Sequence, residues 1–179
     1  TGPTAAGLGA AALGALRAAR RRGSDLQDAL SLMDETVRRL GNPEFYVTAL
    51  VARWRAATAT LTWTSCGHPP AYLVDTDGAL HELESEPHPP LGTGNAEPSF
   101  RLTERRLRAG ERLILVTDGI TGRRTEDGGT FGVDGLRRAV ERAATPTAAG
   151  TAMAIQQAVT DSWAEPLEDD ATVVVLAVE

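Results

Sequence analysis

The chain has 179 residues, enough for one domain with a substantial core, and its 42% hydrophobic and 23% charged residues are typical of a globular protein. Its net charge of −6 argues against nucleic acid as the main partner, because binding to a phosphate backbone requires a basic surface. The single cysteine, Cys66, excludes an internal disulfide and fits a reducing compartment, so we expect a cytoplasmic protein.

The N-terminal region, residues 3 to about 40, is predicted to form two helices. Pro3 suits a first helical turn, and Ala5 to Arg22 consists mostly of strong helix formers. Gly23 is expected to end the first helix and Ser24 to cap the second. Apolar residues then recur at helical spacing, at Leu26, Leu30, Met33 and Val37.

Within the first of these helices, the apolar stretch from Ala5 to Leu16 stops at Arg17, so it is too short to cross a bilayer and no membrane span is predicted. We interpret the glycines of this region, at Gly2, Gly7, Gly9 and Gly14, as small residues that allow close helix packing. The chain begins at Thr1 without a methionine, and we interpret it as a piece of a longer protein.

A run of antiparallel strands is predicted between residues 44 and 117. Alternating apolar and polar residues within it, and the turn residues between its segments, indicate three hairpins. They are Phe45 to Trp54 with Thr58 to Ser65, Ala71 to Val74 with Leu80 to Leu83, and Phe100 to Leu107 with Arg112 to Thr117.

Two further helices and a returning strand are predicted to complete the chain. The helices extend from Val133 to Ala144 and from Thr147 to Trp163, and the strand from Val173 to Leu176. Strands followed by helices and a last strand indicate an α+β layered fold.

Acidic residues lie at the ends of the two most apolar strands. Asp118 follows the run Leu113 to Thr117, and Asp169 and Asp170 precede the terminal strand. Two acids brought together at strand ends repel each other, and a hard cation such as Mg²⁺ or Mn²⁺ relieves that repulsion. The alternative is an ordinary turn, since Asp-Gly is among the commonest turn dipeptides.

No other set of catalytic residues is apparent. The three histidines, His68, His81 and His88, are scattered and adjoin turns or strand ends, so a structural role is the simpler interpretation. No serine lies in a nucleophile elbow, and Cys66 is expected to be a small buried residue at a strand end.

Six short motifs together resemble the SpoIIE/RsbU-type branch of the bacterial metal-dependent (PPM) serine/threonine phosphatases. They occur in the family's order, and the resemblance covers nearly the whole chain. The motifs are Phe45 to Leu50, Gly67-His68-Pro69-Pro70, Pro90-Leu91-Gly92, Thr117-Asp118-Gly119-Ile120, Phe131-Gly132 and Asp169-Asp170-Ala171-Thr172.

The resemblance implies a layered α-β-β-α sandwich of two mostly antiparallel sheets flanked by helices. It also implies a metal site at Asp118, Asp169, Asp170 and Gly119, with Asp118 and Asp169 as the catalytic ligands. In the family two Mn²⁺ or Mg²⁺ ions share a water or hydroxide that attacks the phosphorus of a phosphoserine or phosphothreonine. That chemistry requires no protein nucleophile, which agrees with the lack of a triad.

The sequence departs from the family in two places. An acid often stands where this chain has Gly122. The family's first metal motif, a Gly-Asp dyad whose aspartate bridges both metals, should lie a few residues before Thr1. We therefore expect residues 1–179 to form a single phosphatase domain that lacks its N-terminal strands and first metal motif, and to bind one ion or none.

Two functional classes follow from the resemblance. The first is a protein phosphatase domain, whose substrate in this family is often a phosphorylated anti-anti-sigma factor, and the second is a degenerate module that binds a partner without turnover. A homodimer through the N-terminal helices is also expected, since Ala5, Gly9 and Ala12 form a face of small residues. The alternative is that these helices only cover the sheet of their own subunit.

Overall fold

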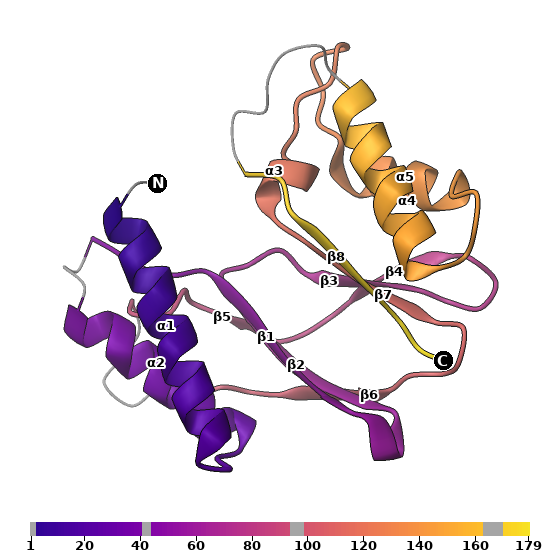
Figure 1. Ribbon diagram of the computed structural model, residues 1–179. Coiled ribbons are helices and arrows are strands. Elements are labelled where there is room, and N and C mark those ends of the chain that lie inside the picture. The colour runs from indigo at the N-terminus through magenta and orange to yellow at the C-terminus, as the bar shows by residue number, and fades with distance from the viewer. Residues whose placement is uncertain (1–2, 41–43, 94–98, 163–169) are drawn as a thin grey trace. The chain divides into compact units, whose positions relative to one another are not determined.

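The computed structural model describes residues 3–40, 44–93, 99–162 and 170–179 of the chain (Figure 1). The chain divides into two compact units. Unit 1 comprises Thr1–His68 and Ser85–Arg106, and unit 2 comprises Pro69–Glu84 and Leu107–Glu179. Each unit has its own sheet, helices and apolar core. That residues 1–179 form one domain remains a prediction.

Unit 1 begins with the two predicted helices, α1 (Pro3–Arg21) and α2 (Leu26–Leu40), which lie side by side (Figure 1). Gly23 follows α1 with a φ of 75°, a conformation that glycine adopts without a steric penalty. Its N–H donates to the carbonyl of Arg20 at 3.1 Å, which closes the last turn of the helix. The prediction that Gly23 ends the first helix is confirmed.

The cap of α2 differs from the prediction. Asp25, not Ser24, accepts the N–H of Asp28 on its side chain, at 2.8 Å, and its carbonyl accepts the first intrahelical bond from Ala29. These two bonds place Asp25 at the N-cap position. Its carboxylate there also interacts favourably with the positive end of the helix dipole.

The buried face of α1 is spaced by three or four residues and packs in the core of unit 1. Its members are Leu8, Ala12, Ala15 and Ala19. A Cβ built on Gly7, Gly9 or Gly14 would meet no other atom within 4 Å, so these glycines do not permit close packing as predicted. Ala12 is only 2% exposed and already packs within its own unit, whereas Leu13 is 44% exposed.

The sheet of unit 1 has four strands in the order β1-β2-β5, with β6 also paired to β2. β1 and β2 form the predicted hairpin, joined by a short 3₁₀ helix (Ala56–Thr58), and their register pairs Ala49 with Cys66. β5 is parallel to β2, and β6 is antiparallel to it. The strands are β1 (Ala49–Arg55), β2 (Thr60–Cys66), β5 (Pro87–His88) and β6 (Thr103–Arg106).

A buried carboxylate joins α2 to the Pro90-Leu91-Gly92 loop. Asp34 is 2% exposed, accepts the N–H of Gly92 at 2.8 Å and forms an ion pair with Arg38. The surrounding core holds Leu91 and Val37, both fully buried. A Cβ at Gly92 would lie 2.6 Å from Cγ1 of Val37, so the loop approaches the helix too closely for a larger residue.

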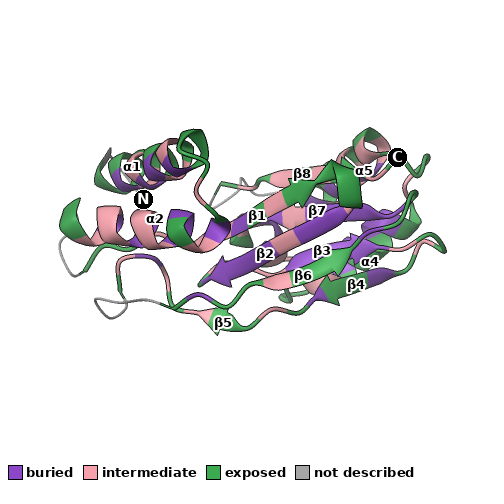
Figure 2. Cartoon of the chain, turned by 90° about the horizontal axis from the view of Figure 1, so that it is seen from below, coloured by how far each residue is buried: buried purple, intermediate pink, exposed green. Residues whose placement is uncertain are grey.

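In its described residues, unit 2 contains an antiparallel sheet in the order β4-β3-β7-β8 and three helices. Helices α4 and α5 pack on the sheet through one apolar core, and Thr147 caps α5 by accepting the N–H of Gly150 at 3.0 Å (Figures 1 and 2). The strands are β3 (Ala71–Val74), β4 (Leu80–Leu83), β7 (Arg112–Val116) and β8 (Val173–Ala177); the helices are α3 (Asp118–Thr121), α4 (Gly132–Glu141) and α5 (Ala148–Asp161).

The two sheets, mostly antiparallel and accompanied by helices, confirm the predicted α+β class. The third predicted hairpin is wrong, because β6 pairs with β2 whereas β7 lies between β3 and β8. Both edges of β7 are thus occupied by strands of its own unit. The turn before β7 binds the C-terminal segment instead, with the N–H of Gly110 donating to the carbonyl of Val178 at 2.8 Å.

No helix in the described ranges is long and apolar enough to span a bilayer.

Replacing Asp34 is expected to destabilise the protein. Asp34→Ala removes the acceptor of the Gly92 N–H and the partner of Arg38, so we expect it to lower the free energy of unfolding by about 1–3 kcal/mol, whereas Asp34→Asn retains an acceptor and should cost less. Urea denaturation provides the measurement. Glu35→Ala is the matched control, because it removes an exposed ion pair of the same spacing, with Arg39, and should change stability by less than about 1 kcal/mol.

The thiol of Cys66 is expected to be unreactive in the folded protein. Burial, with a smaller contribution from the charge of Asp34, raises the pKa of Cys66 to about 11. Because the thiolate is the reactive form, less of it is present near pH 8 than for an ordinary cysteine. Ellman's reagent should label the native chain far more slowly than the chain in guanidinium chloride, and equal rates would contradict the burial of Cys66.

Candidate functional site

Asp118 lies at the end of a buried strand of unit 2. The apolar strand β7 continues into Thr117, which is extended with φ −84° and ψ 163°, and α3 begins at Asp118. The side chain of Asp118 is exposed, and its Oδ1 accepts the N–H of Gly119 at 3.0 Å. The described residues give this carboxylate no second hydrogen bond, so its other oxygen is available to a ligand.

Thr117 joins the two acidic motifs. Its hydroxyl donates to the carbonyl of Asp170 at 2.9 Å and accepts the N–H of Thr172 at 2.9 Å. Its own N–H donates to the carbonyl of Thr172 at 3.1 Å. These bonds connect residues that are more than fifty apart in sequence, and they hold the Asp118 turn beside the segment that enters β8 (Figure 1).

Gly119 brings the two backbones into direct contact. A Cβ at this position would lie 2.5 Å from the carbonyl oxygen of Asp170 and 3.2 Å from the nitrogen of Ala171. Real Cβ atoms do not approach backbone atoms so closely, so the contact requires glycine. The Asp118-Gly119 turn therefore lies against the backbone of Asp170 and Ala171.

The donors at this edge suit a hard cation. The exposed Asp118 carboxylate and the nearby backbone oxygens are the ligand types that Mg²⁺ and Mn²⁺ prefer. Asp169 lies outside the described residues, and the described part of the chain contains no group of three or more potential metal-binding side chains. The metal site at Asp118, Asp169, Asp170 and Gly119, and the predicted approach of the Asp118 and Asp169 carboxylates, stay predictions.

Gly122, where the family often has an acid, closes α3. Its N–H donates to the carbonyl of Asp118 at 2.6 Å, and a Cβ there would lie 2.8 Å from that oxygen. A side chain at position 122 would require the turn that holds Asp118 to loosen.

Two other motifs of the resemblance contact each other within unit 1. Gly67 has a φ of 65°, and a Cβ on it would lie 2.5 Å from Cγ of Pro90. The N–H of Gly67 donates to the carbonyl of His88 at 2.9 Å, and the carbonyl of His68 accepts the hydroxyl of Ser65 at 2.7 Å. These contacts fix the backbone of the Gly67-His68 turn.

Sequence reasoning missed the roles of Thr117 and Asp34. The signal for Thr117 was its position directly before Asp118-Gly119, where a short hydroxyl side chain can form hydrogen bonds with neighbouring backbone groups. For Asp34, the signal was an acid four residues after Leu30 and three residues before Val37, on the buried face of the helix.

Solved structures similar to this chain are phosphatase domains. The PP2C phosphatase domain of SpoIIE from Bacillus subtilis, with a fragment of its regulatory domain, is 20% identical, and the match covers 92% of this chain and 48% of that one with a TM-score of 0.78. The RsbU and RsbW domains of a Mycobacterium tuberculosis protein are 20% identical over 98% and 49%, with a TM-score of 0.77. A PPM Ser-Thr phosphatase from Mycobacterium smegmatis, in complex with cacodylate, is 18% identical over 95% and 81%, with a TM-score of 0.71.

These likenesses define the architecture as that of the PP2C-type (PPM) phosphatase domain. The chain spans about half the length of the first two of these structures. The family model described as Stage II sporulation protein E (SpoIIE) matches residues 1–179, so the chain belongs to the SpoIIE family. No curated protein matches it.

A methyl group at Gly119 is expected to separate the two motifs. Gly119→Ala would force the Asp170 backbone away and should lower the free energy of unfolding by about 1–3 kcal/mol, the usual cost of overpacking. Gly14→Ala is the control, because position 14 is an exposed helical site with open space, where alanine should stabilise by about 0.5–1 kcal/mol. Thermal or urea melts of both variants make the comparison, and equal effects would contradict the close contact.

Proposed function

We propose that this chain is a metal-dependent protein phosphatase domain that hydrolyses phosphoserine or phosphothreonine. The observation that carries the proposal is the contact of the Asp118-Gly119 turn with the Asp170-Ala171 backbone, in a chain that matches the SpoIIE family over its whole length. The similar structure from M. smegmatis is named a PPM Ser-Thr phosphatase, which supports the same reaction class.

Asp118 and Asp169 are proposed as carboxylate ligands of Mn²⁺ or Mg²⁺, with Asp170 beside them. A similar B. subtilis SpoIIE structure was presoaked with manganese, which supports this choice of cation. When bound, such ions lower the pKa of a coordinated water and neutralise charge on the phosphoryl oxygens. Gly119 would contribute by its lack of a side chain, which lets the Asp118 turn approach Asp170.

The remaining residues of the site act by positioning. Thr117 fixes the Asp118 turn against the segment before β8, and the N–H of Gly119 orients the Asp118 carboxylate. Cys66, the one thiol of the chain, is buried with a raised pKa, so it does not provide an alternative nucleophile. The proposed chemistry therefore depends on carboxylates rather than on a covalent intermediate.

Turnover is proposed to require a further aspartate. By the family resemblance, a Gly-Asp dyad ahead of Thr1 supplies the residue that bridges two ions. Asp118 and Asp169 alone would hold one ion weakly, so the 179-residue chain is expected to have little activity without that dyad.

The protein substrate is proposed to be a phosphorylated anti-anti-sigma-factor-like regulator, on the family resemblance alone. A homodimer through the N-terminal helices also stays a prediction, and α1 offers exposed residues such as Leu13 for it rather than the buried Ala12.

The second candidate function is a binding module without turnover. The glycine at position 122 favours it, because the family often has an acid there.

Activity should depend on Mn²⁺ and on Asp118. In a longer chain that includes the Gly-Asp dyad, Asp118→Asn should reduce Mn²⁺-dependent hydrolysis of a phosphothreonine peptide by at least about a hundredfold, because a metal ligand loses its charge. Asp77→Asn is the matched control, since Asp77 is another exposed Asp-Gly aspartate of unit 2, and it should leave the rate unchanged. Phosphate release, with and without EDTA, measures both.

Two results would contradict separate parts of the proposal. Rapid turnover by the 179-residue chain alone would contradict the need for the Gly-Asp dyad, because another residue would then supply the bridge. A longer chain that binds Mn²⁺ but releases no phosphate would favour the binding module.

A further inference from the structure

A buried arginine lies in unit 2 at the start of β7. Arg112 is only 5% exposed, and its neighbours in the sheet are the apolar residues Val74 on β3 and Ala177 on β8. Because a strand lies on each side of it, Arg112 is inside the sheet rather than at a free edge. The proposed metal site is at the other end of β7, since Asp118 follows about 20 Å farther along an extended chain.

The guanidinium group of Arg112 has few partners. Its Nη1 donates to the hydroxyl of Thr151 on α5 at 2.6 Å, whereas its Nε is buried without a hydrogen-bond partner. In the described part of the chain Arg112 forms no ion pair. The adjacent acid, Glu111, instead accepts the N–H of Arg108 at 2.7 Å.

An uncompensated charge at this position is unfavourable. Burial lowers the pKa of Arg112, but arginine keeps its proton in proteins, so the side chain remains a cation. A buried cation requires an anion or several hydrogen-bond acceptors to replace the water that it loses. The single hydroxyl of Thr151 does not replace that water.

The first turn of α5 adds a second positive feature at the same place. Thr151 is the fourth residue of α5, so its hydroxyl holds the guanidinium at the helix end whose N–H groups have no helical acceptors. Thr147 accepts the N–H groups of Gly150 and Thr151. The described residues offer no acceptor to the N–H groups of Ala148 and Ala149. A helix start and a guanidinium group both favour a negative charge.

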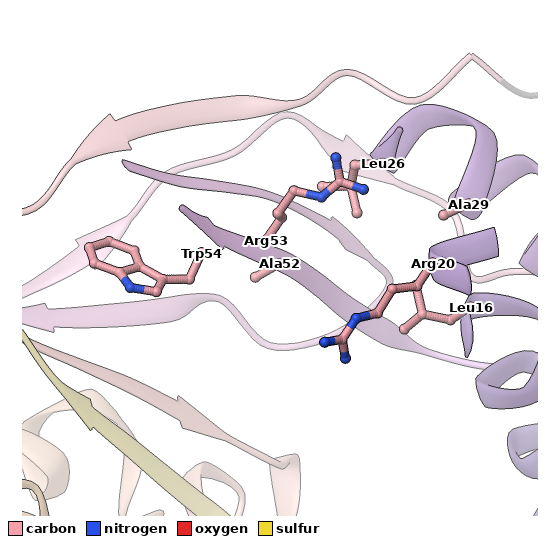
Figure 3. A pocket seen from close by; sticks show the side chains of 7 residues that line it. All are labelled: Leu16, Arg20, Leu26, Ala29, Ala52, Arg53 and Trp54. Carbon is pink, nitrogen blue, oxygen red and sulfur yellow. The ribbon is translucent and has the colours of Figure 1, made fainter. Parts of the chain in front are cut away.

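Arginines in unit 1 differ, because they contact solvent. Figure 3 shows two of them, Arg20 and Arg53, beside a pocket of that unit. Arg20 is exposed, and Arg53 is half-buried and donates to the carbonyl of Ser24 at 2.8 Å. Water compensates for charge at such positions. Arg112 lacks that access, so its charge has to be compensated locally.

We propose that Arg112 and the first turn of α5 bind a small tetrahedral oxyanion of the inorganic phosphate type. A guanidinium group binds oxyanions through paired N–H groups, and the start of a helix adds N–H donors and a favourable dipole. The low exposure of Arg112 limits the ligand to a free ion rather than a phosphate group on a larger molecule. A purely structural role explains the bond to Thr151 but leaves Nε and the charge uncompensated.

Binding of inorganic phosphate in the presence of EDTA tests the proposal independently of metal and turnover. Phosphate should raise the melting temperature of the 179-residue chain by at least about 3 °C over sodium chloride of equal ionic strength, because a ligand of the native state stabilises it. Arg112→Met removes the charge and should abolish the shift. Arg137→Met is the matched control, because Arg137 is an exposed arginine on α4 of the same unit, and it should keep the shift.

A second variant covers the case in which Arg112→Met does not fold. Thr151→Val removes the hydroxyl that positions Arg112 and should at least halve the shift. Asp118→Asn should keep the full shift, and its loss there would place phosphate at the proposed metal site and overturn the proposal.

Three other results would also overturn it. They are no shift beyond that of chloride, an unchanged shift in Arg112→Met or Thr151→Val, and an equal shift with a phosphothreonine peptide, which would mean that the ligand is a group on a larger molecule.

Discussion

The hydrogen bonds of Thr117 are the contact on which the candidate site depends. One hydroxyl both donates to the Asp170 carbonyl and accepts from the Thr172 N–H, so it satisfies two backbone groups at the point where β8 begins. Without these two bonds, the hydrogen bonds described between β7 with its Asp118 turn and the segment of β8 would be the β7–β8 ladder, which ends at Val116 and Val173, and the bond from the Thr117 N–H to the Thr172 carbonyl. The threonine extends the pairing of the two segments beyond the sheet, to the residues that carry the acids.

Two other motifs of the resemblance contain close backbone contacts within unit 1. In unit 1, Asp34 and Gly92 connect α2 with a loop, and Gly67 lies against Pro90. In each case a glycine allows a backbone to approach a neighbouring element that no larger residue could approach. A short motif that identifies a family can therefore mark a close backbone contact instead of a catalytic group.

The sequence predicted most of the elements because their signals are local. Helical spacing predicted α2, and Gly23 correctly marked the end of α1. The pairing of β6 could not be predicted in this way, since Phe100 to Leu107 and Arg112 to Thr117 are adjacent in sequence and strand partners are selected by long-range packing. The ladder of β2 with β6 joins residues about forty apart, beyond the reach of any turn signal.

The candidate site was only partly predictable for a related reason. The Asp118 and Asp170 motifs were visible as acids at strand ends, and the resemblance supplied their roles. The contact that joins them depends on the Thr117 hydroxyl and on the lack of a Cβ at Gly119. Both matter only once the folded backbone has brought the two segments together. A pattern of residue types does not specify that contact until both strands are in place.

The contact at Thr117 also affects the order in which the protein can assemble. It closes a loop between residues that are 53 apart in sequence, and that loop contains α4 and α5. Closing so long a loop is entropically unfavourable until the enclosed helices have packed on the sheet. The acidic motifs would then meet only late in folding, so a partly folded chain would present its carboxylates apart, and a cation bound by both would stabilise the native state selectively.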